Sequence, residues 1–229
     1  MKPELLRFGT GGSPVVVIDG FSGAVDEVVG LAAALSPFPS YRTSYYPGPR
    51  RTIGEGDRDA YAYVVRTLET AAPFIGGAFD IDRFDLLQAS FSMVTTPPEA
   101  LAPPQRAPHF DSVDPRYIAV LHYLSDTPGT GTAFYRQRST GIERVDEGNL
   151  QAFVAAAKAA GGASGYIQGS DAHYEQIGAV EAVPDRLVIY QGCLLHSGII
   201  PPDMVLSADP RRGRLTANIF VQGRKERPQ

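Results

Sequence analysis

The chain has 229 residues, which is long for one average domain but normal for a single large β-barrel or sandwich. Hydrophobic residues make up 43% of the sequence and aromatic residues 10%, so the chain can bury a core of ordinary size. The 25 acidic and 21 basic residues give a formal net charge of −4, which argues against a nucleic-acid surface built from bulk electrostatics.

The cysteine content and the apolar runs of the chain indicate the kind of cellular compartment to expect. Cys193 is the single cysteine, so an intrachain disulfide is excluded and nothing indicates an oxidising compartment. The first residues lack an apolar run of signal-peptide length, and no uninterrupted apolar run approaches a membrane span. We expect a soluble, cytoplasmic protein that binds neither nucleic acid nor membranes. A homodimer is compatible with the sequence but not required by it.

The first part of the chain predicts one strand followed by two helices. A β-branched run over residues 14–18 predicts the strand. Ser22 can cap a helix that runs to about Leu35. Asp57 can cap a second helix, whose apolar stripe ends before Pro73.

The rest of the chain predicts mostly strands. We expect them at residues 83–95, 117–124, 132–136, 186–190, 194–196 and 214–221, with one more helix capped by Asn149 and closed by Gly161 and Gly162. Strands interrupted by loops rather than by regular helices favour an antiparallel double-sheet jelly roll. We therefore predict a mainly β (α+β) single domain over residues 1–229. Residues 1–80 would form a helical support region and residues 81–222 the jelly-roll core.

Five polar residues in three segments form the candidate site. His109 and Asp111 lie two positions apart, so on a strand their side chains would point to the same face. His196 can complete a three-ligand set that leaves one side of a metal open. Two histidines and one carboxylate are typical of non-heme Fe(II) oxygenases, because O2 and a cosubstrate need the open positions. Arg214 and Thr216 are also two apart, and a guanidinium beside a hydroxyl suits one end of a small dicarboxylate.

With these residues in this order, the chain resembles the Fe(II)/2-oxoglutarate-dependent oxygenases, specifically their prolyl-hydroxylase-like branch. Stretches 121–126, 131–134 and 183–190 are similar to further motifs of that family, in the family's order. The resemblance covers roughly residues 80–222. It departs from the family at residues 129–132, where Gly-Thr-Gly-Thr replaces a plain Gly-Gly pair, and at residues 185–186, where Asp-Arg occupies a turn. The resemblance implies a double-stranded β-helix, a cupin-like jelly roll.

The resemblance also implies a cofactor set and an activity. Fe(II) would be bound by His109, Asp111 and His196, which form the catalytic centre, and 2-oxoglutarate would chelate the metal at one end. Arg214, helped by Thr216, would hold the other end. The implied enzyme is a dioxygenase that uses O2, most often to hydroxylate its substrate, here an unidentified small molecule, amino acid or peptide.

Two rival classes share the jelly-roll shape. A cupin-type hydrolase or isomerase would use the three ligands for a Zn²⁺-activated water. Arg214 and Thr216 disfavour it, because that chemistry needs no dicarboxylate anchor. A non-catalytic jelly-roll binding module is disfavoured by the complete set of three ligands. The primary substrate is not identified by the sequence.

Several other residues have two interpretations. Tyr123 can hydrogen-bond the cosubstrate carboxylate or serve as a core tyrosine. His122 shares a strand face with apolar residues and is expected in the core or an interface, whereas His173 lies in a polar loop and is expected to be solvated. Cys193 is expected to be a small core residue. Residues 40–51 interleave tyrosines with arginines, which is compatible with an ordinary loop or with a recognition surface, and the resemblance implies that such a segment forms a substrate lid.

Overall fold

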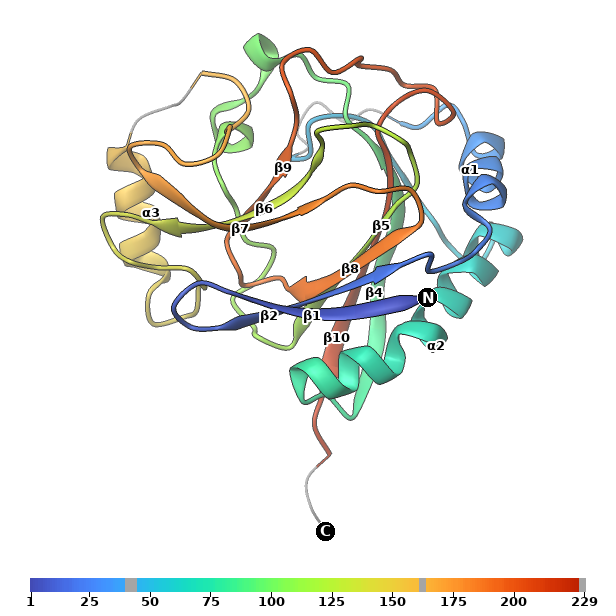
Figure 1. The fold of residues 1–229 in the computed structure, drawn as a ribbon, viewed down its shortest axis with the longest axis horizontal. Coiled ribbons are helices and arrows are strands. Elements are labelled where there is room, and N and C mark those ends of the chain that lie inside the picture. The colour runs from blue at the N-terminus through green and yellow to red at the C-terminus, as the bar shows by residue number, and fades with distance from the viewer. Residues whose placement is uncertain (40–44, 161–163, 227–229) are drawn as a thin grey trace.

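Two antiparallel sheets form the body of the molecule, and α-helices pack against them (Figure 1). The structure is a computed structural model that describes residues 1–39, 45–160 and 164–226. The larger sheet has seven strands in the order β1-β2-β8-β5-β10-β4-β3, and the smaller has three in the order β7-β6-β9. This architecture confirms the predicted mainly β jelly roll, a double-stranded β-helix with N-terminal supporting helices.

The strands are β1 (Lys2–Phe8), β2 (Ser13–Asp19), β3 (Arg50–Thr52), β4 (Arg83–Met93), β5 (Tyr117–Tyr123), β6 (Gly131–Gln137), β7 (Tyr174–Glu181), β8 (Arg186–Gln191), β9 (His196–Ile199) and β10 (Leu215–Arg224). The α-helices are α1 (Val25–Ala34), α2 (Arg58–Phe79) and α3 (Leu150–Ala159). Short 3-10 helices cover Pro98–Ala100 and Pro103–Arg106.

Side-chain alternation along the central strand β5 shows how the large sheet buries both of its faces. Leu121 and its alternate neighbours pack toward the small sheet, together with Phe134 of β6 and Val188 of β8. Val120 and its alternate neighbours pack against α1 and α2, where they meet Val64 and other helix residues. Both helices therefore support the outer face of the sheet, and the inner face is left for the space between the sheets.

The helices begin and end at different residues than the sequence predicts. Helix α1 begins three residues after Ser22, whose hydroxyl instead donates to the Asp185 carboxylate. Asp57 is the N-cap of α2, but this helix continues through Pro73 to Phe79. An internal proline costs about 3 kcal/mol in an isolated helix. Here burial of the next turn, including Ile75, against the sheet offsets that cost.

Three strands were not predicted, and a fourth begins later than expected. β1 and β7 are largely exposed or half-buried edge strands, so they lack the apolar alternation that marks a strand in sequence. β3 begins with the last two residues of the stretch 40–51, for which we expected a loop or a lid. β9 begins at His196, because Leu194 and Leu195 pair instead with residues 143–144, through a bridge from Leu194 to Arg144 and a hydrogen bond from Leu195 to the Glu143 carbonyl.

Residues 1–80, for which we expected a helical support region, supply α1 and α2 and also the strands β1, β2 and β3 of the large sheet. Helix α3 follows Asn149 as predicted. The predicted closing residues Gly161 and Gly162, like residues 40–44 of the aromatic and basic stretch, lie outside the described residues.

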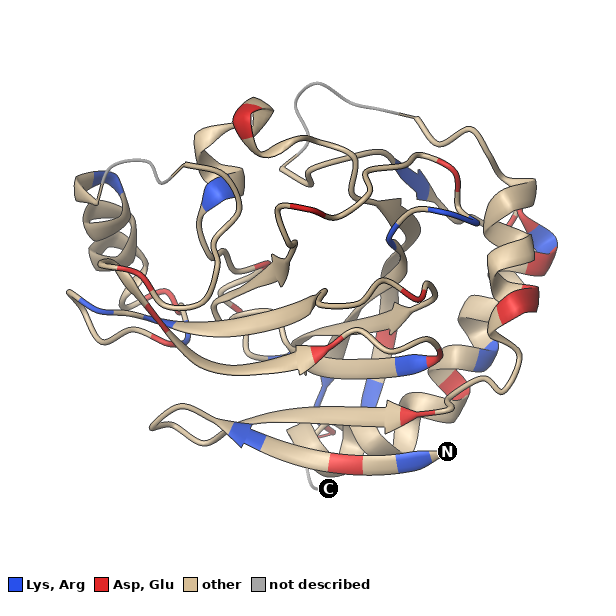
Figure 2. Cartoon of the chain, turned by 45° about the horizontal axis from the view of Figure 1, so that its top comes forward, with Lys and Arg blue, Asp and Glu red and all other residues tan. Residues whose placement is uncertain are grey.

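Charges of both signs are interspersed along the described chain (Figure 2). No helix in the described ranges has both the length and the apolar character needed to cross a membrane.

A buried carboxylate ties the helices to the large sheet. Asp185, just before β8, accepts hydrogen bonds from the Ser22 and Gly23 backbone N–H groups at 2.9 and 2.7 Å. It also contacts Nε2 of His122 at 2.9 Å, and Nδ1 of His122 contacts the Tyr63 hydroxyl of α2 at 2.8 Å. The side chain of His122 is fully buried, so its predicted core location is correct.

We expect Asp185→Asn to lower the free energy of unfolding by about 3 kcal/mol at pH 7, because several hydrogen bonds to a charged acceptor are lost. Asparagine tolerates the left-handed backbone at this position, where φ is 63°, so backbone strain does not contribute. The exposed Asp203→Asn is the matched control. Urea denaturation measures the free energy of unfolding of both variants, and equal values would contradict the role of Asp185.

The same contacts predict the pH dependence of this effect. Burial opposes ionisation of Asp185, yet hydrogen bonds from His122, Ser22 and Gly23 hold its pKa well below the ordinary 3.8. A carboxyl group with a lowered pKa stabilises the fold above its unfolded-state pKa, and this contribution is lost as the pH falls. The difference in the free energy of unfolding between wild type and Asp185→Asn should therefore be smaller at pH 3 than at pH 7.

Candidate metal centre and cavity

A backbone pairing between two distant segments creates the candidate site. His109 and His196 form an isolated antiparallel bridge, with hydrogen bonds of 2.9 Å from N–H of His109 to O of His196 and 2.8 Å in the other direction. The two imidazole rings consequently lie side by side, with centroids 4.4 Å apart. The predicted strand at His109 is thus reduced to a single bridge at the start of β9, and Asp111 lies in the bend that follows.

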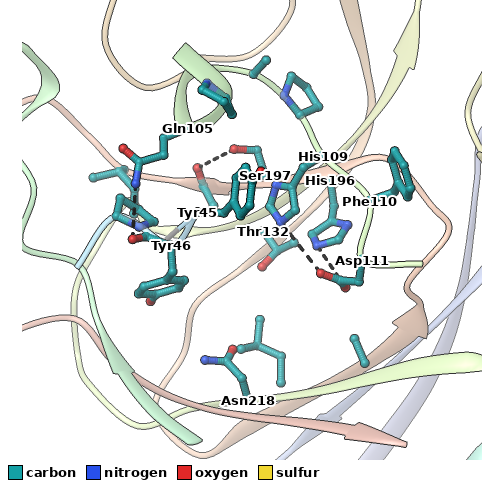
Figure 3. Close-up of a pocket in the computed structure, with 18 of the residues that line it drawn as sticks. Tyr45, Tyr46, Gln105, His109, Phe110, Asp111, Thr132, His196, Ser197 and Asn218 are labelled. Carbon is teal, nitrogen blue, oxygen red and sulfur yellow. Dashed lines mark hydrogen bonds and ion pairs between the residues drawn. The ribbon is translucent and has the colours of Figure 1, made fainter. Parts of the chain in front are cut away.

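Asp111 is positioned by the turn between β8 and β9. Its backbone N–H donates to the Gly192 carbonyl at 2.7 Å, which fixes the bend. A Cβ at Gly192 would lie 2.6 Å from the Tyr117 ring and 3.1 Å from Cβ of Asp111, so this close approach requires glycine. The carboxylate then faces both imidazoles, with Oδ1 4.0 Å from Nε2 of His109 and Oδ2 3.6 Å from Nε2 of His196 (Figure 3).

The tautomer of His196 follows from its backbone contact. Its Nδ1 lies 2.8 Å from the Leu194 carbonyl oxygen, which can only accept, so Nδ1 carries the proton. Burial lowers the pKa of His196 to about 4, and the imidazole is therefore neutral at pH 7. The adjacent His196 also lowers the pKa of His109, whose side chain is 54% exposed. Nε2 of His196 therefore offers a lone pair toward Asp111, as a metal ligand must.

The three side chains together leave a place for a cation. One ligand atom from each of His109, Asp111 and His196 can be chosen so that all lie within 4.8 Å of one another. Oδ2 of Asp111 is buried and has no hydrogen-bond partner among the described residues. Burial raises the pKa of this carboxyl group, so its ionised form is disfavoured without a cation. The donor set fits a divalent transition metal, although the role of these residues as ligands stays a prediction.

The triad opens into a cavity of about 630 Å³, which is within the usual range for small-molecule sites. The predicted anchor residues Arg214 and Thr216 line the same cavity and are only 5% and 1% exposed. Arg214 donates from one terminal nitrogen to the Gly131 carbonyl at 3.0 Å, but its buried Nε has no partner among the described residues. A buried guanidinium with a free donor is suited to a carboxylate ligand.

Tyr123 lies beside this anchor. Its ring centroid is 5.9 Å from the Arg214 guanidinium carbon, and its buried hydroxyl contacts the Thr132 hydroxyl at 2.7 Å. Thr132 itself lines the cavity. The structure therefore gives Tyr123 a core position with an internal hydrogen bond, and its contact with a cosubstrate stays a prediction. His173 is exposed in its loop, as predicted, and Cys193 is buried.

Three further residues that line the cavity were not predicted as site residues from the sequence. Asn218 lies two residues beyond Thr216 on the same strand and points into the cavity, so strand alternation would have found it (Figure 3). Tyr190 of β8 packs edge-on against the His196 ring, with centroids 4.8 Å apart. Arg50 of β3 was noted only as part of the aromatic and basic stretch, and its place in the cavity depends on the pairing of β3 with β4.

We expect His109→Ala, Asp111→Ala and His196→Ala each to weaken binding of a divalent transition metal strongly, because two remaining ligands form an incomplete set. The exposed His173→Ala is the matched control. Titration with Ni²⁺ followed by calorimetry measures the affinity, and circular dichroism checks that each variant is folded. A folded variant that keeps the wild-type affinity would remove its residue from the site.

Solved structures with a similar fold share the jelly-roll architecture at low sequence identity. HygX from Streptomyces hygroscopicus, solved with nickel and 2-oxoglutarate, is 16% identical over 92% of this chain and 83% of its own, with a TM-score of 0.56. The α-ketoglutarate-dependent epimerase SnoN from nogalamycin biosynthesis is 15% identical over 92% of this chain and 79% of its own, with a TM-score of 0.54. A Pseudomonas putida prolyl-4-hydroxylase is 15% identical over 94% of this chain and 95% of its own, with a TM-score of 0.51. At such identities the likeness shows the fold.

No curated protein sequence matches the chain. One family model does match, over residues 1–221, and it covers both sheets and all the candidate site residues. The chain therefore belongs to the family described as "Family of unknown function (DUF6445)".

Proposed function

We propose that this protein is an Fe(II)- and 2-oxoglutarate-dependent oxygenase, specifically a dioxygenase of the prolyl-hydroxylase-like kind. One observation carries the proposal. A single cavity holds a two-histidine, one-carboxylate set and a buried Arg214, and neither Oδ2 of Asp111 nor Nε of Arg214 has a hydrogen-bond partner among the described residues. The first group needs a cation and the second an anion, and a metal chelated by a dicarboxylate supplies both.

The similar folds support the choice of cosubstrate. HygX was solved with 2-oxoglutarate and nickel, and with iron, while SnoN was solved with Fe³⁺ and α-ketoglutarate. SnoN is an epimerase, so this fold is not restricted to hydroxylation. We propose hydroxylation of a small-molecule, amino-acid or peptide substrate as the outcome for this chain.

Each part of the cavity has a separate task in this proposal. His109, Asp111 and His196 would hold the metal on one side and leave its other side facing the cavity. Arg214 would place two parallel N–H donors on the far carboxylate of 2-oxoglutarate, with Thr216 adding a hydroxyl from the same strand. Bound iron and 2-oxoglutarate would supply the oxidation by O2, with succinate and CO2 as the products of the cosubstrate. The apolar cavity wall, which includes Phe110, limits the access of water.

Anaerobic titration with Fe(II) and 2-oxoglutarate tests the metal and the cosubstrate together. We expect a weak visible charge-transfer band that requires both additions, because the keto acid must chelate a bound iron. A zinc-dependent hydrolase or isomerase and a non-catalytic binding module both predict no such band. Its absence in a protein shown to bind Fe(II) would contradict the proposed function.

Arg214 provides the sharper test of the cosubstrate. Arg214→Lys keeps the charge but loses the planar fork, so the dissociation constant of 2-oxoglutarate should rise markedly while Fe(II) affinity stays nearly unchanged. Arg214→Ala should raise this dissociation constant further, because removing one partner of a buried charge pair costs about 3–5 kcal/mol. The exposed Arg212→Ala, two residues earlier, is the matched control.

Calorimetry of 2-oxoglutarate binding to the metal-loaded variants decides the question. If neither Arg214 variant changes the dissociation constant by tenfold, about 1.4 kcal/mol, Arg214 is not the anchor.

A further inference from the structure

The inner face at one edge of the large sheet is polar although it is buried. On β4, Ser90 and Ser92 are both fully buried, and on the neighbouring strand β10 they lie opposite Asn218 and Thr216. The alternate residues of both strands, such as Phe91, face the helices and are apolar. A buried polar surface is costly unless its groups are hydrogen-bonded. Packing alone would be served by apolar residues, so the polar residues at these positions call for another explanation.

Arg50 adds a positive charge to this polar wall. It is the first residue of β3, lies opposite Ser92 of β4, and lines the cavity. Its Nε donates to the Ser92 hydroxyl at 3.2 Å, and one terminal nitrogen donates to the Ser90 hydroxyl at 3.4 Å. Its guanidinium carbon also lies 5.0 Å from the centroid of the Tyr46 ring. The serines and the tyrosine therefore hold the guanidinium in place without neutralising it.

No carboxylate among the described residues forms an ion pair with Arg50. The neighbouring Arg51 is different, because it points away from the cavity and pairs with Asp57 at 2.6 Å. An arginine has five N–H donors, and these hydrogen bonds of Arg50 use two of them. Among the described residues, the half-buried guanidinium thus keeps unused donors and a positive charge without an ion-pair partner beside the cavity.

The Arg50 site is separate from the Arg214 anchor. β3 and β10 lie on opposite sides of β4, so Arg50 and Thr216 face each other across Ser92. Two strand spacings place their backbones roughly 10 Å apart. The cavity therefore has two cationic positions, and one small dicarboxylate that is chelated to the metal and held by Arg214 leaves Arg50 without an anionic partner.

We propose that Arg50 binds an anionic group, a carboxylate or a phosphate, on the primary substrate. The inference rests on the proposed function, which assigns Arg214 to the cosubstrate. The remaining wall of the cavity is largely apolar and includes Phe110, Phe153, Tyr166 and Ile200, so the body of the substrate is aliphatic or aromatic. The substrate class is thus an apolar acid whose charged end lies at β3 and whose body reaches toward the triad.

Matched pairs of acids and their neutral amides test this inference directly. The probes are phenylacetate with phenylacetamide and octanoate with octanamide, each titrated into the protein loaded with Ni²⁺ and saturating 2-oxoglutarate, so that Arg214 is already occupied. Ligand-observed NMR measures the dissociation constants. We expect at least one acid to bind wild type more tightly than its amide, and its dissociation constant to rise at least tenfold in Arg50→Gln.

Two further variants separate recognition from folding. Arg50→Lys keeps the charge and should restore part of the preference for the acid. Arg51→Gln removes the adjacent arginine of the same strand, which does not line the cavity, and should bind acids and amides as wild type does. If no acid binds better than its amide, or if Arg50→Gln binds the acids as wild type does, the inference is wrong.

The dissociation constant of 2-oxoglutarate, measured in the same variants, keeps the two proposals apart. An unchanged value in Arg50→Gln agrees with a substrate role for Arg50. A rise above tenfold would place Arg50 in the cosubstrate site, which overturns this inference and leaves the proposed function standing. If wild type binds no 2-oxoglutarate at all, the proposed function fails, and the acid and amide comparison without cosubstrate still shows whether Arg50 binds anions.

Discussion

The pairing of His109 with His196 is the constraint on which the candidate site depends. Two reciprocal backbone hydrogen bonds join a loop before β5 to the first residue of β9, and they place the imidazole rings 4.4 Å apart. The next contact along the chain, from Asp111 to the Gly192 carbonyl, brings the carboxylate to the same point. Because backbone hydrogen bonds hold all three residues, the fold fixes the positions of these candidate ligands, which would lower the entropic cost of binding a metal there.

The large sheet separates support from chemistry by using its two faces differently. Its outer face packs against α1 and α2, and the contacts of Asp185 with His122 and with the turn just before α1 hold that layer in register. Its inner face lines the cavity with polar groups from β4 and β10. Strand alternation makes this division possible, since neighbouring residues of one strand serve opposite faces. A helix covering the outer face can therefore be stabilised without altering the composition of the cavity.

Groups that favour opposite charges occupy different parts of the cavity. Two neutral histidines and a buried carboxylate at one place favour a cation, while Arg214 and Arg50 at two other places favour anions. Charge matters more inside this cavity than the formal net charge of −4 suggests, because interactions between buried groups are screened far less by water and salt. The positive charge of Arg50 also favours the ionised form of Asp111, which counteracts part of the effect of burial.

The sequence by itself determined the fold class, because apolar alternation reports which side chains share a face of a strand. The two-residue spacings and a later histidine also pointed to His109, Asp111, His196, Arg214 and Thr216 as candidate site residues, and the fold brings these five residues to one cavity. It did not reveal β1, β7 or the continuation of α2 past Pro73, since edge strands lack alternation and burial of Ile75 outweighs a local helix breaker. Nor did it place Arg50, whose neighbours at Ser90 and Ser92 are about forty residues away and become neighbours only when β3 pairs with β4. Spacing within one strand is a local property that can be read from the chain. Pairing between distant strands is decided by the free energy of the whole fold, and only the tertiary structure shows it.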